Sequence, residues 1–339
     1  GISWTKISSV NRLGVRYAPK GFIFDSAGQT LFPEKDNLLY IIGFLCSNIA
    51  PKILEVLNPT LNFQVGDLER IPIIFSNKNK KEIKQKARES IEIAKNDWDS
   101  FETSWEFTKH PLLKFHSDTV KFSFNKWKQF ASSQFNQLKK NQVELNRIFI
   151  EIYGLQDELT PEVEDNDITI RKAKLNRDII SFISYAVGCM FGRYSLDEEG
   201  LIYAGGEFDP IKYQSFPADE DNILPILSSV NFEEDIVARF IEFIQVAYGV
   251  ETLEENLNFI ASAIGRRQNE TARATLRRYF LNDFYQDHVK TYQKRPIYWL
   301  FTSGKEKAFN CLIYVHRYDK TTLSRIRTDY LHDVQARYD

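Results

Sequence analysis

Cysteine and histidine are scarce in this sequence of 339 residues, which contains 3 cysteines and 5 histidines. Cys46, Cys189 and Cys311 are far apart and have apolar neighbours in the sequence, so we expect reduced thiols in the core of a cytosolic protein. The histidines at positions 110, 116, 288, 316 and 332 are scattered, and no Cys/His spacing indicates zinc. No metal site is predicted.

A long apolar run is also missing. The apolar stretch 38–57 is interrupted by Asn48, Pro51, Lys52 and Glu55, whereas a membrane-spanning helix needs about 20 apolar residues. The sequence does not open with the basic and then apolar pattern of a secretory signal. We therefore expect a cytoplasmic location and no membrane partner. The first residue is glycine and the sole methionine lies at position 190, which favours a fragment or a trimmed product.

Recognisable catalytic patterns are absent too. No Ser-His-Asp or paired-carboxylate arrangement can be nominated, and the acidic loop 157–167 lacks the spacing and glycine of a calcium loop. Asp67 followed by Glu82-Ile83-Lys84 has the order of residues found in metal-dependent nucleases, but any lysine-rich helix produces Glu-x-Lys by chance. The pair Gly188 and Gly192 follows no strand, so it favours close helix packing over phosphate binding. We expect no catalytic, cofactor or metal residues in this chain.

The segment 37–73 organises the rest of the sequence. Apolar spacing predicts a helix over 38–57, which Asn58-Pro59 ends. Residues 61–66 alternate as a half-buried strand does, 67–70 indicate a turn, and 71–75 indicate a short apolar strand. A helix, two short strands and then a long charged helix are typical of a docking region.

Helical periodicity dominates the remaining sequence. We predict helices over 80–105, 119–152, 168–194, 232–246, 253–264 and 270–292, with Gly154 ending the second of these. Residues 2–33 are expected to be β-rich, and 296–301 and 309–315 are expected to form a hairpin. The predicted class is α+β and mostly α-helical, with regions at 1–76 (β-rich), 77–167 (long helical spacer) and 168–339 (helical, with the hairpin at 296–315).

Several long words resemble the downstream half of BREX-type adenine-specific DNA methyltransferases, the PglX family. They are NPTLNFQVGDLERIPI from 58, IEIAKNDWDSFETSWEFTKHPLL from 91, ELNRIFIEIYGLQDELTPEVE from 144, ISFISYAVGCMFGRYSLDEEGLIYAGG from 180 and KRPIYWLFTSGKEKAF from 294. The resemblance implies an amino-methyltransferase whose catalytic domain, with its S-adenosylmethionine, lies upstream of Gly1. Residues 1–76 would then be the C-terminal half of the target-recognition region.

That chemistry needs a glycine-rich turn for S-adenosylmethionine and an Asn-Pro-Pro-aromatic loop for the flipped adenine. Asn58-Pro59-Thr60-Leu61 shares only the first two letters of the loop and follows a helix end. We therefore expect this chain by itself to be catalytically silent.

The net charge of −2 hides a segregation along the sequence. Lysine and arginine outnumber acids by 22 to 15 in residues 1–150 and by 15 to 8 in 261–339, whereas acids prevail by 23 to 7 in 151–260. Since DNA is a polyanion, the basic ends are candidate double-stranded DNA surfaces; solvated helix faces are the alternative. The candidate DNA-binding residues lie in or beside the turns of the front sheet, at the tip of the hairpin, and on the turn and helix that follow it: Arg12, Arg16, Tyr17, Lys20, Lys305, Lys307, Arg317, Arg325 and Arg327.

The hypothesis is a DNA-recognition and scaffold portion of a site-specific adenine-N6 DNA methyltransferase of a phage-defence (BREX) system. The alternative is a non-catalytic scaffold whose acidic middle binds other defence proteins.

Overall fold

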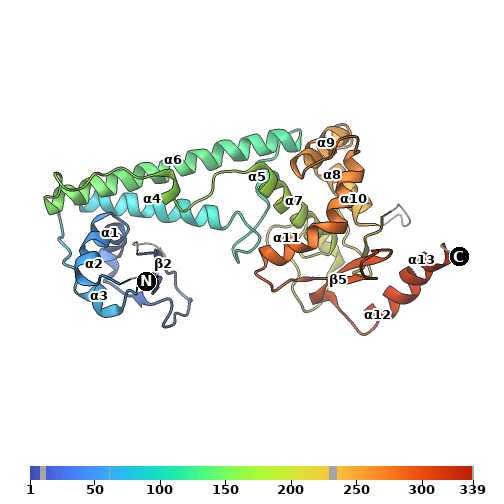
Figure 1. Cartoon of the computed structure of the whole chain (residues 1–339), viewed down its shortest axis with the longest axis horizontal. Coiled ribbons are helices and arrows are strands. Elements are labelled where there is room, and N and C mark those ends of the chain that lie inside the picture. The colour runs from blue at the N-terminus through green and yellow to red at the C-terminus, as the bar shows by residue number, and fades with distance from the viewer. Residues whose placement is uncertain (8–12, 61, 229–234, 338–339) are drawn as a thin grey trace. The chain divides into compact units, whose positions relative to one another are not determined.

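The structure is a computed structural model that describes residues 1–7, 13–60, 62–228 and 235–337. About half of the chain is helical (51%) and 7% is strand, which confirms the mostly helical α+β class. The chain forms two compact units (Figure 1). Unit 1 comprises 1–97 and 131–172, and unit 2 comprises 98–130 and 173–339.

Unit 1 begins with a small antiparallel sheet of strand order β2-β1-β3. Its strands are β1 (Ile2–Trp4), β2 (Val15–Tyr17) and β3 (Thr30–Leu31), and Ile2 lies opposite both Tyr17 and Leu31. Trp4 is 1% exposed and donates from Nε1 to the carbonyl of Phe63 (3.1 Å), which ties the sheet to the helical part of the unit. The expected β-rich start is confirmed.

The predicted helix over 38–57 is two helices, α1 (Lys35–Leu45) and α2 (Ile49–Leu57), bent by 80°. At the break the Ser47 hydroxyl donates to the carbonyl of Phe44 (2.6 Å), and the Asn48 N–H donates to the Asn146 side chain (3.0 Å). Backbone groups at the break are thus satisfied by side chains instead of by a continuing helix. No single helix among the described residues is long and apolar enough to cross a membrane; only this bent pair passes, on length and composition alone.

The strand expected over 61–66 and the turn over 67–70 are wrong. Of the described residues there, Asn62 forms only an isolated antiparallel bridge with Ile7, and the chain then enters the short helix α3 (Val65–Glu69). The Asp67 carboxylate accepts the Gln64 N–H (2.8 Å) at the start of this helix. The same carboxylate accepts from the Asn58 amide (2.6 Å) and from Arg70 (2.9 Å). Capping of the first turn therefore outweighs the alternation of the side chains.

The strand expected over 71–75 is also wrong: among the described residues, no strand pairs with this segment. Two tyrosines bind its backbone groups instead. The Tyr153 hydroxyl donates to the carbonyl of Pro72 (2.6 Å) and accepts the Ile74 N–H (3.1 Å). The Tyr40 hydroxyl donates to the carbonyl of Ile74 (2.8 Å) and accepts the Ser76 N–H (3.0 Å).

Two long helices follow in the chain, α4 (Lys80–Trp98) and α6 (Val120–Tyr153), and α6 belongs to unit 1 from Ala131 onward. In unit 1 they pack together with α1, and a Cβ on Gly43 would lie 3.1 Å from Ile83 and 3.6 Å from Ala87 (Figure 1). The prediction for α6 is confirmed, with Gly154 at φ +67° ending it. The helix predicted over 80–105 is too long by seven residues. The acidic loop that follows α6 contains one short 3₁₀ turn, η1 (Asp165–Asp167).

Unit 2 is built around α7 (Leu175–Met190), whose residues from Ser184 to Met190 are all buried. The helix is shorter than the predicted 168–194, but its burial is confirmed. The close helix packing predicted at Gly188 is not what the structure has: a Cβ there would lie 2.5 Å from the ring of Tyr194, which follows the end of α7. The predicted helix 270–292 is broken at Asp283 into α10 (Ala272–Asn282) and α11 (Phe284–Thr291). The other helices of this unit are α5 (Pro111–Lys114), η2 (Pro210–Lys212), α8 (Ile236–Tyr248) and α9 (Leu253–Ala263).

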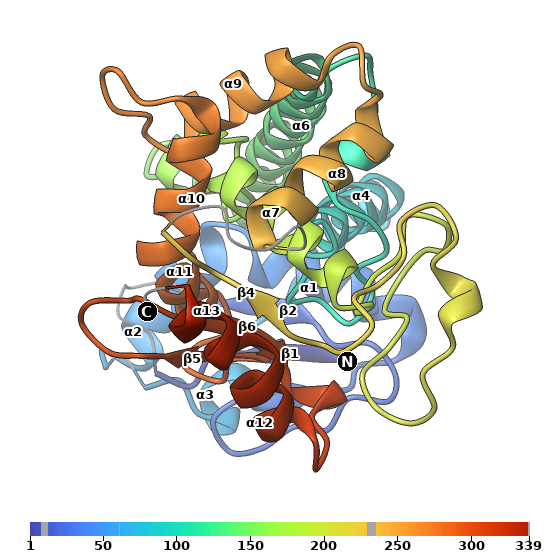
Figure 2. The same cartoon turned by 90° about the vertical axis from the view of Figure 1, so that its right-hand side faces the viewer.

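The C-terminal hairpin is confirmed as β5 (Tyr298–Thr302) and β6 (Asn310–Tyr314). A third strand that the sequence did not indicate, β4 (Leu224–Pro225), pairs with β6 and gives the order β4-β6-β5. The last helices are η3 (Val315–Arg317), α12 (Thr322–Arg325), the π-helical turn η4 (Ile326–Leu331) and α13 (His332–Ala336). Ile326 and Val334 pack against Phe309, Cys311 and Ile313, so the end of the chain covers this sheet (Figure 2).

Candidate nucleic-acid interface

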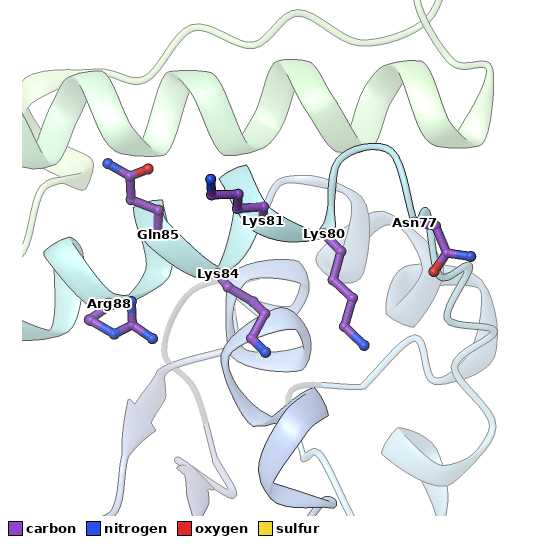
Figure 3. A pocket seen from close by; sticks show the side chains of 6 residues that line it. All are labelled: Asn77, Lys80, Lys81, Lys84, Gln85 and Arg88. Atoms are coloured by element: carbon purple, nitrogen blue, oxygen red, sulfur yellow. The ribbon is translucent and has the colours of Figure 1, made fainter.

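The first turns of α4 carry a row of cations that we call the basic surface of α4: Lys80, Lys84 and Arg88. Together with Asn77, Lys81 and Gln85 these residues line an open, shallow pocket of about 510 Å³ (Figure 3). Four of the six lining side chains are cationic and none is acidic. The ligand class that fits such a lining is an anion.

The position of this row follows from the packing of α4. Ile83 and Ala87 are 0% and 3% exposed and face the core, where they contact α1 at Gly43. Lys80, Lys84 and Arg88 are spaced by four residues, so they lie one above another on a single helix face. In Figure 3 these three side chains project to one side of α4, and Lys81 and Gln85 project to the side of α6.

Of the acids of α4, Glu82 and Glu89 lie on other faces, whereas Glu92 continues the row four residues beyond Arg88 and lies outside the lining of the pocket. Glu82 lies beside Glu144 of α6, and Glu89 pairs with Lys86 (3.8 Å). Glu89 and Glu92 line a second hollow together with two glutamines of α6. The helix therefore presents acids toward α6 and leaves the row Lys80, Lys84 and Arg88 without an acidic neighbour in the lining of its pocket.

Several other cations of unit 1 are ion-paired. Arg147 binds Glu144 (2.5 Å) and Glu151 (2.9 Å) along α6. Lys139 and Lys172 both bind Asp165 (2.7 Å each) and hold the pKa of that carboxyl low, at about 2. The three cations of the basic surface of α4 differ from these: within the described ranges none of them is ion-paired, and Lys80 donates to the side chain of Asn37 (3.5 Å).

The residues predicted at the front sheet are exposed in part. Arg16 lies on the edge strand β2 and donates to the Thr5 hydroxyl (3.0 Å), Tyr17 is 43% exposed, and Lys20 is exposed. Arg12 falls outside the described residues. Arg16, Tyr17 and Lys20 are available to a ligand, and their role in DNA binding stays a prediction.

The residues predicted near the hairpin divide into two groups. Lys305, Arg325 and Arg327 are exposed. Lys307 instead donates to the carbonyl of Leu281 (3.0 Å) and to the side chain of Asn282 (2.6 Å) at the end of α10.

Arg317 serves mainly to hold a loop of unit 2. Its guanidinium donates to the carbonyls of Asp219 (2.7 Å) and Glu220 (3.0 Å) and lies over the Phe208 ring (4.1 Å to the ring centre). Burial lowers the pKa of Arg317, although the neighbouring Asp219 opposes the shift. Sequence could not separate this bound arginine from exposed ones, because its partners are about 98 residues away in the chain.

In the Asn58-Pro59 segment, the side chain of Asn58 makes hydrogen bonds inside the fold. The Asn58 amide nitrogen donates to Asp67 (2.6 Å) and to the carbonyl of Asn62 (2.8 Å), and its oxygen accepts from the N–H of Thr60 (3.0 Å). Both ends of this amide are therefore used inside unit 1. No group of three or more His, Cys, Asp or Glu that could hold a metal occurs among the residues that the structure describes.

Over its whole length the chain is homologous to a part of adenine-specific methyltransferases. One relative is the adenine-specific methyltransferase PglX of Lacticaseibacillus casei (strain Zhang), 44% identical over 347 aligned residues that cover 100% of this chain and 28% of the relative. Another is the adenine-specific methyltransferase BrxX of Escherichia coli O9:H4 (strain HS), 41% identical over 370 aligned residues that cover 100% of this chain and 30% of the relative. No protein-family profile matches the chain.

The chain thus spans less than a third of the length of these two relatives. The resemblance inferred from its long sequence words is confirmed. What the matched part does within the longer relatives is a separate question.

Proposed function

We propose that this chain is the DNA-recognition and scaffold portion of a site-specific adenine-N6 DNA methyltransferase of a phage-defence (BREX) system. The observation that carries the proposal is the homology over the whole chain at 44% identity. In this assignment S-adenosylmethionine and the catalytic loop belong to a part of the protein outside this chain, and double-stranded DNA is the ligand of this part.

The described side chains support a chain that binds DNA and leaves catalysis to another part of the protein. Asn58 begins the segment that shares two letters with the catalytic Asn-Pro-Pro-aromatic loop, and both ends of its side-chain amide are used in local hydrogen bonds. Exposed cations occur on the front sheet and beyond the hairpin, and α4 carries the exposed Arg88 beside the half-buried Lys80 and Lys84. A duplex held by such residues is bound mainly through its phosphates, which makes binding strongly dependent on salt.

Two assays on the purified chain test the proposal. Fluorescence anisotropy with a labelled duplex should show binding, and the logarithm of the association constant should fall linearly with the logarithm of the salt concentration. Incubation with S-adenosylmethionine and DNA should transfer no methyl group. The absence of binding to every duplex at low salt, or methyl transfer by this chain alone, would overturn the assignment.

A protein-interaction scaffold is the second candidate, favoured by the excess of 23 acids over 7 cations in residues 151–260. Affinity capture from host lysate with and without nuclease separates the two. Partners that remain after the DNA has been destroyed favour the scaffold, and partners lost with the DNA favour DNA binding.

A further inference from the structure

We propose that the basic surface of α4, Lys80, Lys84 and Arg88, binds successive phosphates of a DNA backbone and does so independently of base sequence. The inference rests on the proposed function and adds a site to it, because the sequence analysis placed DNA contacts only at the front sheet and near the hairpin. The three side chains project to the same side of the helix (Figure 3).

The arrangement is unfavourable for the isolated helix. Like charges four residues apart destabilise a helix by about 0.2–0.5 kcal/mol per pair, and the row contains two such pairs. The first turn of α4 also lies at the positive end of the helix dipole, where cations are disfavoured. Glu92, four residues beyond Arg88, offsets the charge at one end of the row only, and no acid lines the pocket, whereas Arg147, Lys139 and Lys172 of the same unit are each paired with carboxylates. A bound anion would supply the missing compensation.

The dimensions favour an extended polyanion over a small phosphate compound. From residue 80 to residue 88 the helix rises by about 12 Å, at about 1.5 Å per residue. One DNA strand carries a phosphate about every 3.4 Å of axis, so the row spans roughly three or four phosphates. A single phosphate would meet only one or two of the three cations.

The lining also indicates which part of DNA is bound. The other lining residues, Asn77, Lys81 and Gln85, include no aromatic side chain on which a base could stack. Lysine and arginine side chains in a shallow, open hollow contact phosphates, and such contacts position a duplex without reading its sequence. We therefore assign the surface to backbone binding, with base recognition left to other residues.

The test compares two triple variants of the full chain by anisotropy over a salt series. One is Lys80→Gln/Lys84→Gln/Arg88→Gln. The matched control is Lys121→Gln/Lys128→Gln/Lys140→Gln, which removes the same charge from three exposed lysines of α6. Circular dichroism melts verify that both variants fold.

At about 0.9 per phosphate contact, the α4 variant should lower the slope of log K against log salt by about 3, on two duplexes of unrelated sequence. The control should keep the wild-type slope within about 1. A wild-type slope in the α4 variant refutes this site and leaves the proposed function intact. Equal losses in both variants show a general charge effect, and a loss on only one duplex shows base recognition; either result also refutes it. Wild-type chain that binds no duplex refutes the proposed function itself.

Discussion

Asp67 holds together the segment that follows α2, so its removal should destabilise unit 1 strongly. Its side chain is 12% exposed and accepts hydrogen bonds from the Gln64 N–H, the Asn58 amide and Arg70. The pKa of Asp67 is lowered: burial opposes ionisation, but the bonds from Gln64, Asn58 and Arg70 together outweigh it. The ionised carboxylate is therefore the form that stabilises the fold.

The size of the effect can be built from the three contacts. Loss of the helix cap at Gln64 costs about 1 kcal/mol. Loss of the bond from the Asn58 amide to a carboxylate costs about 1.5 kcal/mol. Arg70 is 57% exposed, so its ion pair contributes about 0.5 kcal/mol. Asp67→Ala should thus lose about 3 kcal/mol, which is about 10 °C in Tm for a unit of this size.

Asp67→Asn is the matched control. The bonds from Gln64 and Asn58 share the oxygen Oδ2, so an asparagine oxygen can keep both and lose only the contact to Arg70. We expect a loss of about 0.5 kcal/mol, the contribution of the Arg70 ion pair. Hydrogen exchange read by mass spectrometry on peptides of residues 50–76, together with thermal melts, localises and measures the change. Equal losses in the two variants, or a loss below about 1 kcal/mol in Asp67→Ala, would refute this reasoning.

Two further predictions concern unit 2. Gly188→Ala should lower the free energy of unfolding in urea by about 2 kcal/mol, because the added Cβ would lie 2.5 Å from the Tyr194 ring. The control Gly66→Ala, whose added Cβ would have nothing within 4 Å, should be neutral or stabilising. Equal effects of the two variants would contradict the close contact between Gly188 and Tyr194. Burial, and then repulsion from Asp221, raises the pKa of Asp219 to about 7. The folded state therefore keeps a proton that the unfolded state releases above its pKa of about 3.8, so the free energy of unfolding should fall as pH rises from about 4 to about 7. Asp219→Asn should flatten this dependence in urea titrations across that range, and an unchanged slope would exclude Asp219 as its source.

Periodicity was sufficient for the long helices and the hairpin. The end of α6 followed from Gly154, because a glycine can adopt the positive φ that ends a helix. The break between α1 and α2 had a sequence signal that periodicity concealed: Pro51 lies in the first turn of α2, where a helix tolerates proline, whereas in the interior of one helix over 38–57 it would remove a hydrogen bond. Gln64 and Asp67 likewise have capping-box spacing, which the alternation of residues 61–66 obscured.

Tertiary contacts determine the features that could not be predicted from the sequence. Strand β4 has two residues, and nothing in Leu224-Pro225 predicts that it pairs with β6. The site predictions met the same limit, since Lys307 and Arg317 are in use within unit 2 and Lys305 is exposed. The row on α4, by contrast, was open to prediction from its spacing of four residues.

The charge segregation along the sequence changes its meaning once the chain is folded. Acids from residues 151–260 meet cations from 261–339 inside unit 2: Arg273 binds Glu254 (2.5 Å), and Arg277 binds Asp235 (2.5 Å). Part of the basic C-terminal end is thereby neutralised by the acidic middle, so these arginines contribute less to an anion-binding surface than their number suggests. The row on α4 is not neutralised in this way, because no acid lines its pocket. A duplex bound by this chain should therefore depend more on α4 than on the arginines of α10, and this ranking can be measured by comparing the salt slopes of variants in the two helices.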